Sequence, residues 1–243
     1  FPIMMKVSDV EKFILKKIKK YGLTCKKVNF YDHHLCHALS SYFFSPFAIK
    51  EKAISFTIDG YGDNRFSSTY LCNGLEYKLI SESKANFFSQ ANKDYIASIG
   101  FVYSNFTQAL GFYPNSDEGI TEALAAFGNI DEDLFLDLNE SISISFDGME
   151  INVEKIKKFY DKKYLKNIIE DIGRENFACT LQRWLEDVVV LYLNKIYEKY
   201  NCDNLCLSGG VAANIIMNLN IYERTKFKNI YIFPAMGDDG ASA

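Results

Sequence analysis

The sequence predicts an α/β protein with a mixed β-sheet. The first half contains an apolar run followed by a pair of runs typical of a β-hairpin, and the second half alternates helical and extended patterns. Hairpins pair antiparallel, whereas strands joined through helices pair parallel, so we expect both directions in one sheet. Glycine-bearing loops directly follow several expected strands, and the ligand crevice of an open α/β sheet lies at the carboxyl ends of its strands.

The N-terminal segment predicts a helix, a short strand and a second helix. Ser8 and Glu11 form a capping box, apolar residues follow at helical spacing, and Gly22 is a typical helix stop. A strand is expected at 28–31 and a helix at 33–44.

The middle of the chain predicts a strand, a hairpin and two helices. Asn73-Gly74 separates β-rich runs at 67–72 and 76–81, and Asn-Gly between two such runs is a strong hairpin signal. The other elements expected here are a strand at 53–58, a helix at 99–110, a loop at 111–119 and a helix at about 120–127.

The C-terminal part predicts a long helix between strands. Apolar residues cover most of the circumference of a helix at 176–200, so we expect this helix to be buried on two sides. The other expected elements are strands at 141–146, 205–207 and 230–233, a helix at 212–224 and a loop that holds 237–240.

Composition excludes several classes of protein. A chain of 243 residues with 48% hydrophobic content and a net charge of −4 is neither disordered nor a disulfide scaffold. The acidic balance disfavours a nucleic-acid partner, and no apolar run approaches the roughly 20 residues that span a bilayer. With no leader apparent, we expect a cytoplasmic protein with no membrane partner and with reduced cysteines.

Every histidine of the chain lies within one short stretch. His33 and His37 are four residues apart, which places both on one helical face at a separation suited to one metal ion. His34 and His37 are three apart, so spacing alone does not say which two act. A single histidine near a helix start is ordinarily a surface or cap residue, but this clustering favours a ligand group.

A metal of the iron or zinc type needs further ligands, such as carboxylates. Asp59 ends a strand and Asp238 follows another, so both could project into one crevice, although aspartate is also a common turn former. Gly209-Gly210 lies between a strand and a helix, an order in which backbone N–H groups hold a phosphate. A tight connection explains the glycine pair equally well.

Six ordered blocks resemble the NodU/CmcH-type O-carbamoyltransferases. They are DHHLCHALS (32–40), DGYGD (59–63), SIGFVYSNFTQALGF (98–112), EG (118–119), LSGGVAAN (207–214) and PAMGDDG (234–240). The resemblance implies an actin/Hsp70-like (ASKHA) fold of two ribonuclease-H-like lobes. Residues 1–50 would be the tail of the first lobe and 51–243 most of the second. The N-terminal hairpin and a C-terminal YrdC-like domain of the same polypeptide would lie outside this chain, which we therefore expect to be part of a longer protein.

The resemblance also implies an activity. Carbamoyladenylate, made from ATP and carbamoyl phosphate, would donate its carbamoyl group to a hydroxyl of a small-molecule or sugar acceptor with help from a metal, iron or zinc. By the same resemblance, the metal ligands and catalytic residues would be His33, His37, Asp59 and Asp238. The residues that lie against the nucleotide would be Glu118, Gly119, Gly209, Gly210 and Asn214. The family usually has a lysine where this chain has Ile120.

Two other functions stay open at this stage. One is a different ASKHA activity, such as a kinase or a threonylcarbamoyl transferase acting on tRNA, the latter disfavoured by the acidic balance. The other is a non-catalytic module that binds a metal or a nucleotide.

Overall fold

The computed structural model describes residues 7–242, without the side chains of Val7 and Ser8, so the predicted capping box lies outside the described residues. The chain divides into two compact units between Asp32 and His33. The first unit contains helix α1 (Val7–Lys20), and Gly22 follows it with a φ of 71°. The assignment of 1–50 and 51–243 to two lobes stays a prediction.

The strand predicted at 28–31 does not form. Among the described residues, no strand pairs with this segment, and its side chains are mostly exposed. A segment without a neighbouring strand makes its backbone hydrogen bonds to water, so the hydrogen bonds of a sheet do not stabilise it as a strand. The apolar residues there gave a β-like pattern with no partner strand to complete it.

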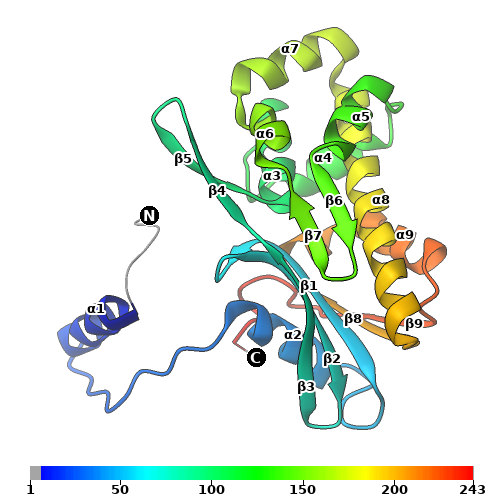
Figure 1. Ribbon diagram of the computed structural model, residues 1–243. Helices are drawn as coiled ribbons and strands as arrows, with labels where there is room; N and C mark the ends of the chain where they lie inside the picture. The colour runs from blue at the N-terminus through cyan, green and yellow to red at the C-terminus, as the bar shows by residue number, and fades with distance from the viewer. Residues whose placement is uncertain (1–6, 243) are drawn as a thin grey trace. The chain divides into compact units, whose positions relative to one another are not determined.

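The second unit is built on a five-stranded mixed sheet with the order β3-β2-β1-β8-β9 (Figure 1). The first three strands form an antiparallel meander, and β8 and β9 run parallel to β1. The strands are β1 (Ala53–Gly62), β2 (Arg65–Asn73), β3 (Glu76–Lys84), β8 (Asn204–Ser208) and β9 (Asn229–Ile232). The mixed sheet and the hairpin across Asn73-Gly74 are therefore confirmed.

Alternate residues of β1 face two different layers. Phe56 and its neighbours at even positions pack into the larger hydrophobic core. Ser55 faces helix α2 (His33–Phe43) instead, and its hydroxyl donates to the carbonyl oxygen of Ala38 at 2.9 Å. Small hydroxyl side chains on this face let α2 approach the sheet closely, so the start of α2 lies beside the carboxyl end of β1.

Helix α8 (Arg174–Tyr200) confirms the predicted long helix and its burial on two sides. Toward the sheet, the Tyr192 hydroxyl lies 2.6 Å from the Thr69 hydroxyl and donates to Ser81 at 2.7 Å. On its other sides α8 contacts α4 (Glu118–Ala125) and α9 (Ile215–Arg224). Although α8 spans 27 residues, neither it nor another helix among residues 7–242 is apolar enough to cross a membrane.

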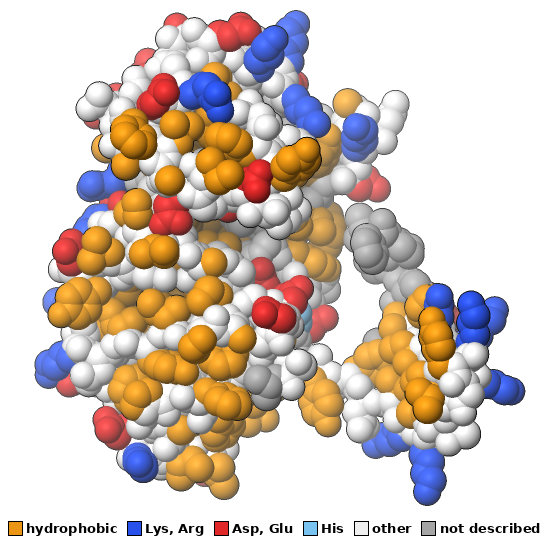
Figure 2. Space-filling model, turned by 180° about the vertical axis from the view of Figure 1, so that it is seen from behind, with side chains coloured by type: hydrophobic (Ala, Val, Ile, Leu, Met, Phe, Trp, Pro, Cys, Tyr) orange, Lys and Arg blue, Asp and Glu red, His pale blue; other side chains and the backbone are white. Residues whose placement is uncertain are grey.

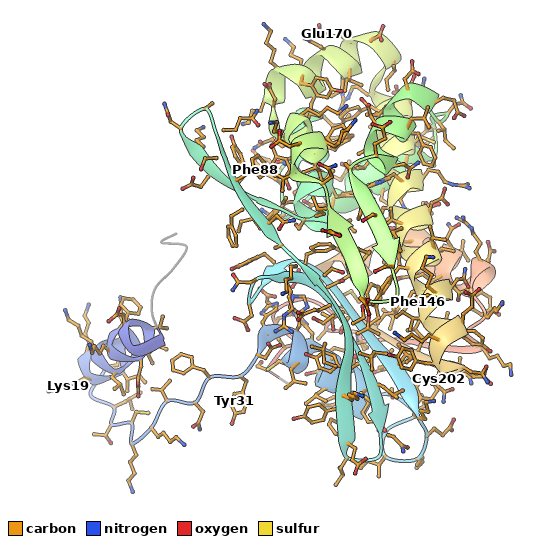
Figure 3. All side chains as sticks on the ribbon, viewed as in Figure 1. Lys19, Tyr31, Phe88, Phe146, Glu170 and Cys202 are labelled. Atoms are coloured by element: carbon orange, nitrogen blue, oxygen red, sulfur yellow. The ribbon has the colours of Figure 1, made fainter. Side chains whose placement is uncertain are left out.

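Two small hairpins and several helices complete this unit. Phe88, labelled in Figure 3, lies in the hairpin of β4 (Asn86–Gln90) and β5 (Lys93–Ala97). Its ring stacks on Tyr95 and meets Tyr160 edge-on. Phe146, also labelled in Figure 3, lies at the tip of the hairpin of β6 (Ile142–Ser145) and β7 (Gly148–Ile151). The ammonium of Lys195 on α8 lies 5.6 Å from the centre of the Phe146 ring. The remaining elements are α3 (Ile99–Ala109), α5 (Glu132–Asn139), α6 (Val153–Ile156), η1 (Lys157–Tyr160), α7 (Lys162–Ile172) and η2 (Gly210–Ala213).

Two predicted helices begin elsewhere. The helix expected from about 120 starts at Glu118, so Glu118 and Gly119 belong to its first turn and not to a loop. The helix expected at 212–224 is interrupted at Asn214, which separates η2 from α9 and caps α9 with its side chain. An asparagine competes with the helix backbone for hydrogen bonds and therefore favours a helix start over a helix interior.

We expect Gly209→Ala to destabilise the fold strongly. Gly209 has a φ of 90°, and an added Cβ would overlap the carbonyl oxygen of Ile58 on the neighbouring strand. The substitution should lower the free energy of unfolding by roughly 3 kcal/mol or more. Urea denaturation can follow it through the fluorescence of Trp184, the single tryptophan of the chain, which is fully buried.

Gly74→Ala is the matched control. Gly74 has a φ of 64°, but no atom lies within 4 Å of an added Cβ. Only the strain of alanine in this left-handed conformation should therefore lower the free energy of unfolding, by about 1 kcal/mol. Equal losses for the two variants would show that the contact between Gly209 and Ile58 does not constrain the fold.

Candidate functional site

Four side chains converge at the carboxyl end of β1. His33 and His37 come from successive turns of α2, Asp59 from β1, and Asp238 from the loop after β9. One ligand atom from each of the four lies within 4.8 Å of the other three. The fold therefore brings together the set that the family resemblance implied.

The spacing of these atoms fits one small cation. His33 Nε2 lies 3.0 Å from Asp59 Oδ2 and 3.5 Å from Asp238 Oδ1. His37 Nε2 lies 3.4 Å from each of the same two oxygens. Ligand atoms held ~2.1 Å from a zinc ion at tetrahedral angles lie roughly 3.4 Å from one another.

Burial differs across the group. The His37 side chain is fully buried, and neither of its ring nitrogens has a hydrogen-bond partner. A buried polar atom without a partner costs about 1–3 kcal/mol, which a cation bound at Nε2 would offset. Asp238, by contrast, is 79% exposed, so the group is open to solvent on its side. Acidic side chains gather beside a partly exposed histidine side chain on the face shown in Figure 2.

The charges favour ligation. Burial alone would raise the pKa of Asp59, but the imidazoles of His33 and His37 outweigh it and hold that pKa below its usual range. The backbone N–H of Gly60 also donates to Asp59 Oδ1, at 2.7 Å. In return, the hydrogen bond to Asp59 raises the pKa of His33. Asp59 is thus ionised and able to bind a cation.

Two other residues of the DGYGD block position His33. Asp63 accepts a hydrogen bond from the backbone N–H of His33 at 2.7 Å, which fixes the first turn of α2. A Cβ at Gly62 would overlap the His33 ring, so only glycine leaves room for that imidazole. Sequence reasoning assigned neither residue a role, although both lie in a quoted motif.

His34 lies outside the group of four. Its Nε2 is 3.2 Å from the carbonyl oxygen of Arg65 on β2, and its side chain is fully buried. Burial lowers the pKa of His34 to about 4, so the ring is neutral and donates to that carbonyl. The spacing of the three histidines left this open, and the fold separates His34 from the other two.

A pocket of about 480 Å³ adjoins the four side chains and shares Asp59 and Asp238 with them. Glu118, Gly119, Gly210 and Asn214 also line it. Further lining residues, not predicted from the sequence, are Tyr103, Ser104, Asn115, Ser116, Glu122 and Leu185. They come from four separate segments of the chain. The sequence could have indicated only Glu122 as a lining residue, because it lies one helical turn after Glu118 on the same helix face.

Gly209 does not line the pocket. It is buried, and its N–H donates to the carbonyl oxygen of Met236 at 2.7 Å. Met236 is two residues before Asp238, so this bond ties the end of β8 to the loop that carries a candidate ligand. Gly209 thus lies outside the pocket and supports, through this hydrogen bond, the loop that carries Asp238.

The first turn of α9 is capped by side chains of the protein. Glu122 accepts from the N–H of Ile216 at 2.7 Å, and Asn214 accepts from the N–H of Met217 at 2.7 Å. A phosphate at this helix start would have to compete with the Glu122 carboxylate. This competition concerns the first turn of α9, so phosphate binding by the backbone at Gly209-Gly210, which the sequence left open, stays untested.

The pocket is acidic. Asp59, Glu118, Glu122 and Asp238 all line it, and none of the described residues of its lining is a lysine or an arginine. Glu118 Oε1 accepts from the Ser104 hydroxyl and the Asn115 N–H, both at 2.6 Å. Ile120, at the position where a lysine was expected by resemblance, is not among the lining residues.

Comparisons with known proteins agree with the predicted fold and family. The chain is 50% identical, over 94% of its length and 37% of the other protein, to the uncharacterized protein MJ1058 of Methanocaldococcus jannaschii. It is 27% identical to the nodulation protein NolNO of Sinorhizobium fredii, over 89% of this chain and 30% of that protein. The chain thus spans less than two fifths of each of these relatives.

The structure also resembles that of full-length HypF in its phosphate- and nucleotide-bound form. The TM-score is 0.51 at 15% sequence identity, over 92% of this chain and 43% of HypF. This likeness supports the predicted ASKHA-type α/β fold class. A protein family described as the carbamoyltransferase N-terminus matches residues 3–243. This chain therefore belongs to the carbamoyltransferase N-terminus family.

Proposed function

We propose that this chain is the metal- and nucleotide-binding part of a carbamoyltransferase. The enzyme would transfer a carbamoyl group from carbamoyladenylate to a hydroxyl of a small-molecule or sugar acceptor. One observation carries the proposal: Asp59 and Asp238 belong both to the four-residue group and to the adjoining pocket. A cation and a nucleotide bound at these two places would be neighbours. Family membership and the nucleotide-bound HypF neighbour support the same assignment.

The donor set suits a divalent metal such as iron or zinc. Two imidazole nitrogens and two carboxylate oxygens are ligands that both metals accept. His33, His37, Asp59 and Asp238 would hold the ion, and His37 Nε2 would gain the partner it lacks. When bound, the metal supplies Lewis-acid polarisation of the carbamoyl carbonyl and offsets charge on the phosphate.

The acidic lining supports a role for a cation in this proposal. A phosphate entering this pocket would meet four carboxylates and no basic side chain from the described lining. Glu118 and Glu122 could instead accept hydrogen bonds from nucleotide hydroxyls or amines, because carboxylates act only as acceptors when ionised. Gly119 and Gly210 present backbone to the pocket, which permits close approach of a flat or bulky ligand.

The transfer itself requires no covalent enzyme intermediate. The acceptor oxygen attacks the carbamoyl carbon, the bond from that carbon to the adenylate phosphate oxygen breaks, AMP leaves, and the proton of the acceptor hydroxyl passes to water. The chain's own residues hold the adenylate and orient its carbonyl, which is catalysis by positioning. We propose that a YrdC-like domain of the same polypeptide supplies the carbamoyladenylate from ATP and carbamoyl phosphate.

We expect His37→Ala to abolish metal binding. The substitution removes one of the four proposed ligands, and the alanine side chain offers no atom that can replace the imidazole nitrogen. Affinity for Fe²⁺ or Zn²⁺ should fall by roughly 100-fold or more. Metal content by elemental analysis and affinity by competition with a chelating dye would measure the loss.

His34→Gln is the matched control, because a glutamine amide can still donate to the Arg65 carbonyl. This variant should keep its metal, since His34 lies outside the group of four. Full metal occupancy in His37→Ala would refute the ligand assignment.

We expect the full-length protein to release AMP from ATP only when carbamoyl phosphate is present. Adding polyols and sugars one at a time should reveal an acceptor that speeds AMP release and gains a carbamate, detected by mass spectrometry. His37→Ala should lose this transfer, while His34→Gln keeps it. Phosphorylation of the acceptor would indicate a kinase, modification of tRNA a threonylcarbamoyl transferase, and binding of metal and AMP without turnover a non-catalytic module.

A further inference from the structure

A buried glutamine lies behind the pocket without lining it. Gln182, on α8, is 3% exposed. It is hydrogen-bonded to Tyr103 of α3 and to Asn214 at the start of α9. Both of these residues line the pocket. Gln182 therefore connects α8 to two residues of the pocket lining, one on α3 and one at the start of α9.

Every hydrogen-bonding position of the Gln182 amide is used. Its Oε1 accepts from the Tyr103 hydroxyl at 2.8 Å and from Asn214 Nδ2 at 2.8 Å. Its Nε2 donates to Asn214 Oδ1 at 2.9 Å and to Glu186 Oε1 at 2.9 Å. An amide offers two donors and two acceptor sites, so no capacity is left over.

The orientation of both amides is fixed from outside the pair. The N–H of Met217 donates to Asn214 Oδ1, so that oxygen cannot exchange places with Nδ2 without breaking the cap of α9. Glu186 accepts from Gln182 Nε2, and a reversed Gln182 would place its oxygen against that carboxylate. Fully satisfied buried networks of this kind specify one arrangement.

We infer that Gln182 is a positioning residue for nucleotide binding, which acts by holding Asn214 and Tyr103 in the geometry that the pocket presents. The inference rests on the proposed function, because it takes the pocket ligand to be a nucleotide. Gln182 itself does not line the pocket, and the four candidate metal ligands take no part in its network. Its loss should therefore weaken nucleotide binding and leave metal binding unchanged.

Gln182→Glu tests this role with little change in shape. An ionised carboxylate can still accept from Tyr103 and from Asn214 Nδ2, but it cannot donate to Asn214 Oδ1 or to Glu186. It would place an oxygen against Asn214 Oδ1 and so push Asn214 out of its observed orientation. We expect AMP to bind about 5- to 10-fold more weakly to the full-length variant, measured by calorimetry with the metal content checked in parallel. Gln108→Glu makes the same substitution at an exposed position of α3 and should bind AMP as the unsubstituted protein does.

A charge-conserving double variant separates positioning from simple stability. In Gln182→Glu with Glu186→Gln, the residue at 186 can donate to the residue at 182, which restores the contact within α8. The donor to Asn214 Oδ1 is still missing. We therefore expect the melting temperature to recover while AMP binding stays weak.

The outcomes are distinct. Recovery of AMP affinity together with the melting temperature would overturn the positioning role, as would unchanged affinity in Gln182→Glu. Loss of metal along with the nucleotide would also overturn it, because the effect would then be general. If the unsubstituted full-length protein binds no AMP, the proposed function itself fails, and this inference fails with it.

Discussion

The close approach of α2 to the central sheet is the contact on which the site depends. Buried hydroxyls mediate it: Ser55 of β1 bonds to the Ala38 carbonyl, and Ser208 of β8 bonds to the His37 carbonyl at 3.0 Å. Larger side chains at these positions would lift the helix away from the sheet. Because β1 and β8 run parallel, their carboxyl ends meet at one edge, where the first turn of α2 also lies. Three of the four candidate ligands are thereby placed by backbone packing before any ion is considered.

Sequence patterns predicted correctly those elements that depend on residues close together in the chain. The Asn73-Gly74 hairpin, the long helix α8 and the mixed sheet follow from turn chemistry and periodicity, and all three form. The strand predicted at 28–31 does not form, because a strand needs a neighbouring strand to pair with and no local pattern can guarantee one. The prediction of one helix at 212–224 was wrong for the opposite reason. A capping residue, Asn214, was present, but the apolar spacing around it suggested one continuous helix.

The candidate site was predictable only in part. The clustered histidines signalled a ligand group, and the family resemblance, more than any spacing rule, selected His33 and His37 over His34. The pocket could not be predicted from spacing, because α3, α4, α8 and the 210–214 segment are distant in sequence and meet only in the folded chain. The functions of Asp63 and Gly62 depend on the position of the His33 ring, which no pattern in the sequence specifies.

The four candidate ligands are not held equally. Those on α2 and β1 sit in regular structure, whereas Asp238 is largely exposed on a loop that the Gly209–Met236 hydrogen bond anchors. The choice of ion and the rate of ion exchange would therefore depend on different parts of the chain. In the proposed metal site, the three ligands in regular structure would determine which ion fits, and Asp238 on its loop would set how quickly an ion enters or leaves. An ion could then be loaded after the chain has folded, from the exposed side of Asp238 and without opening the core.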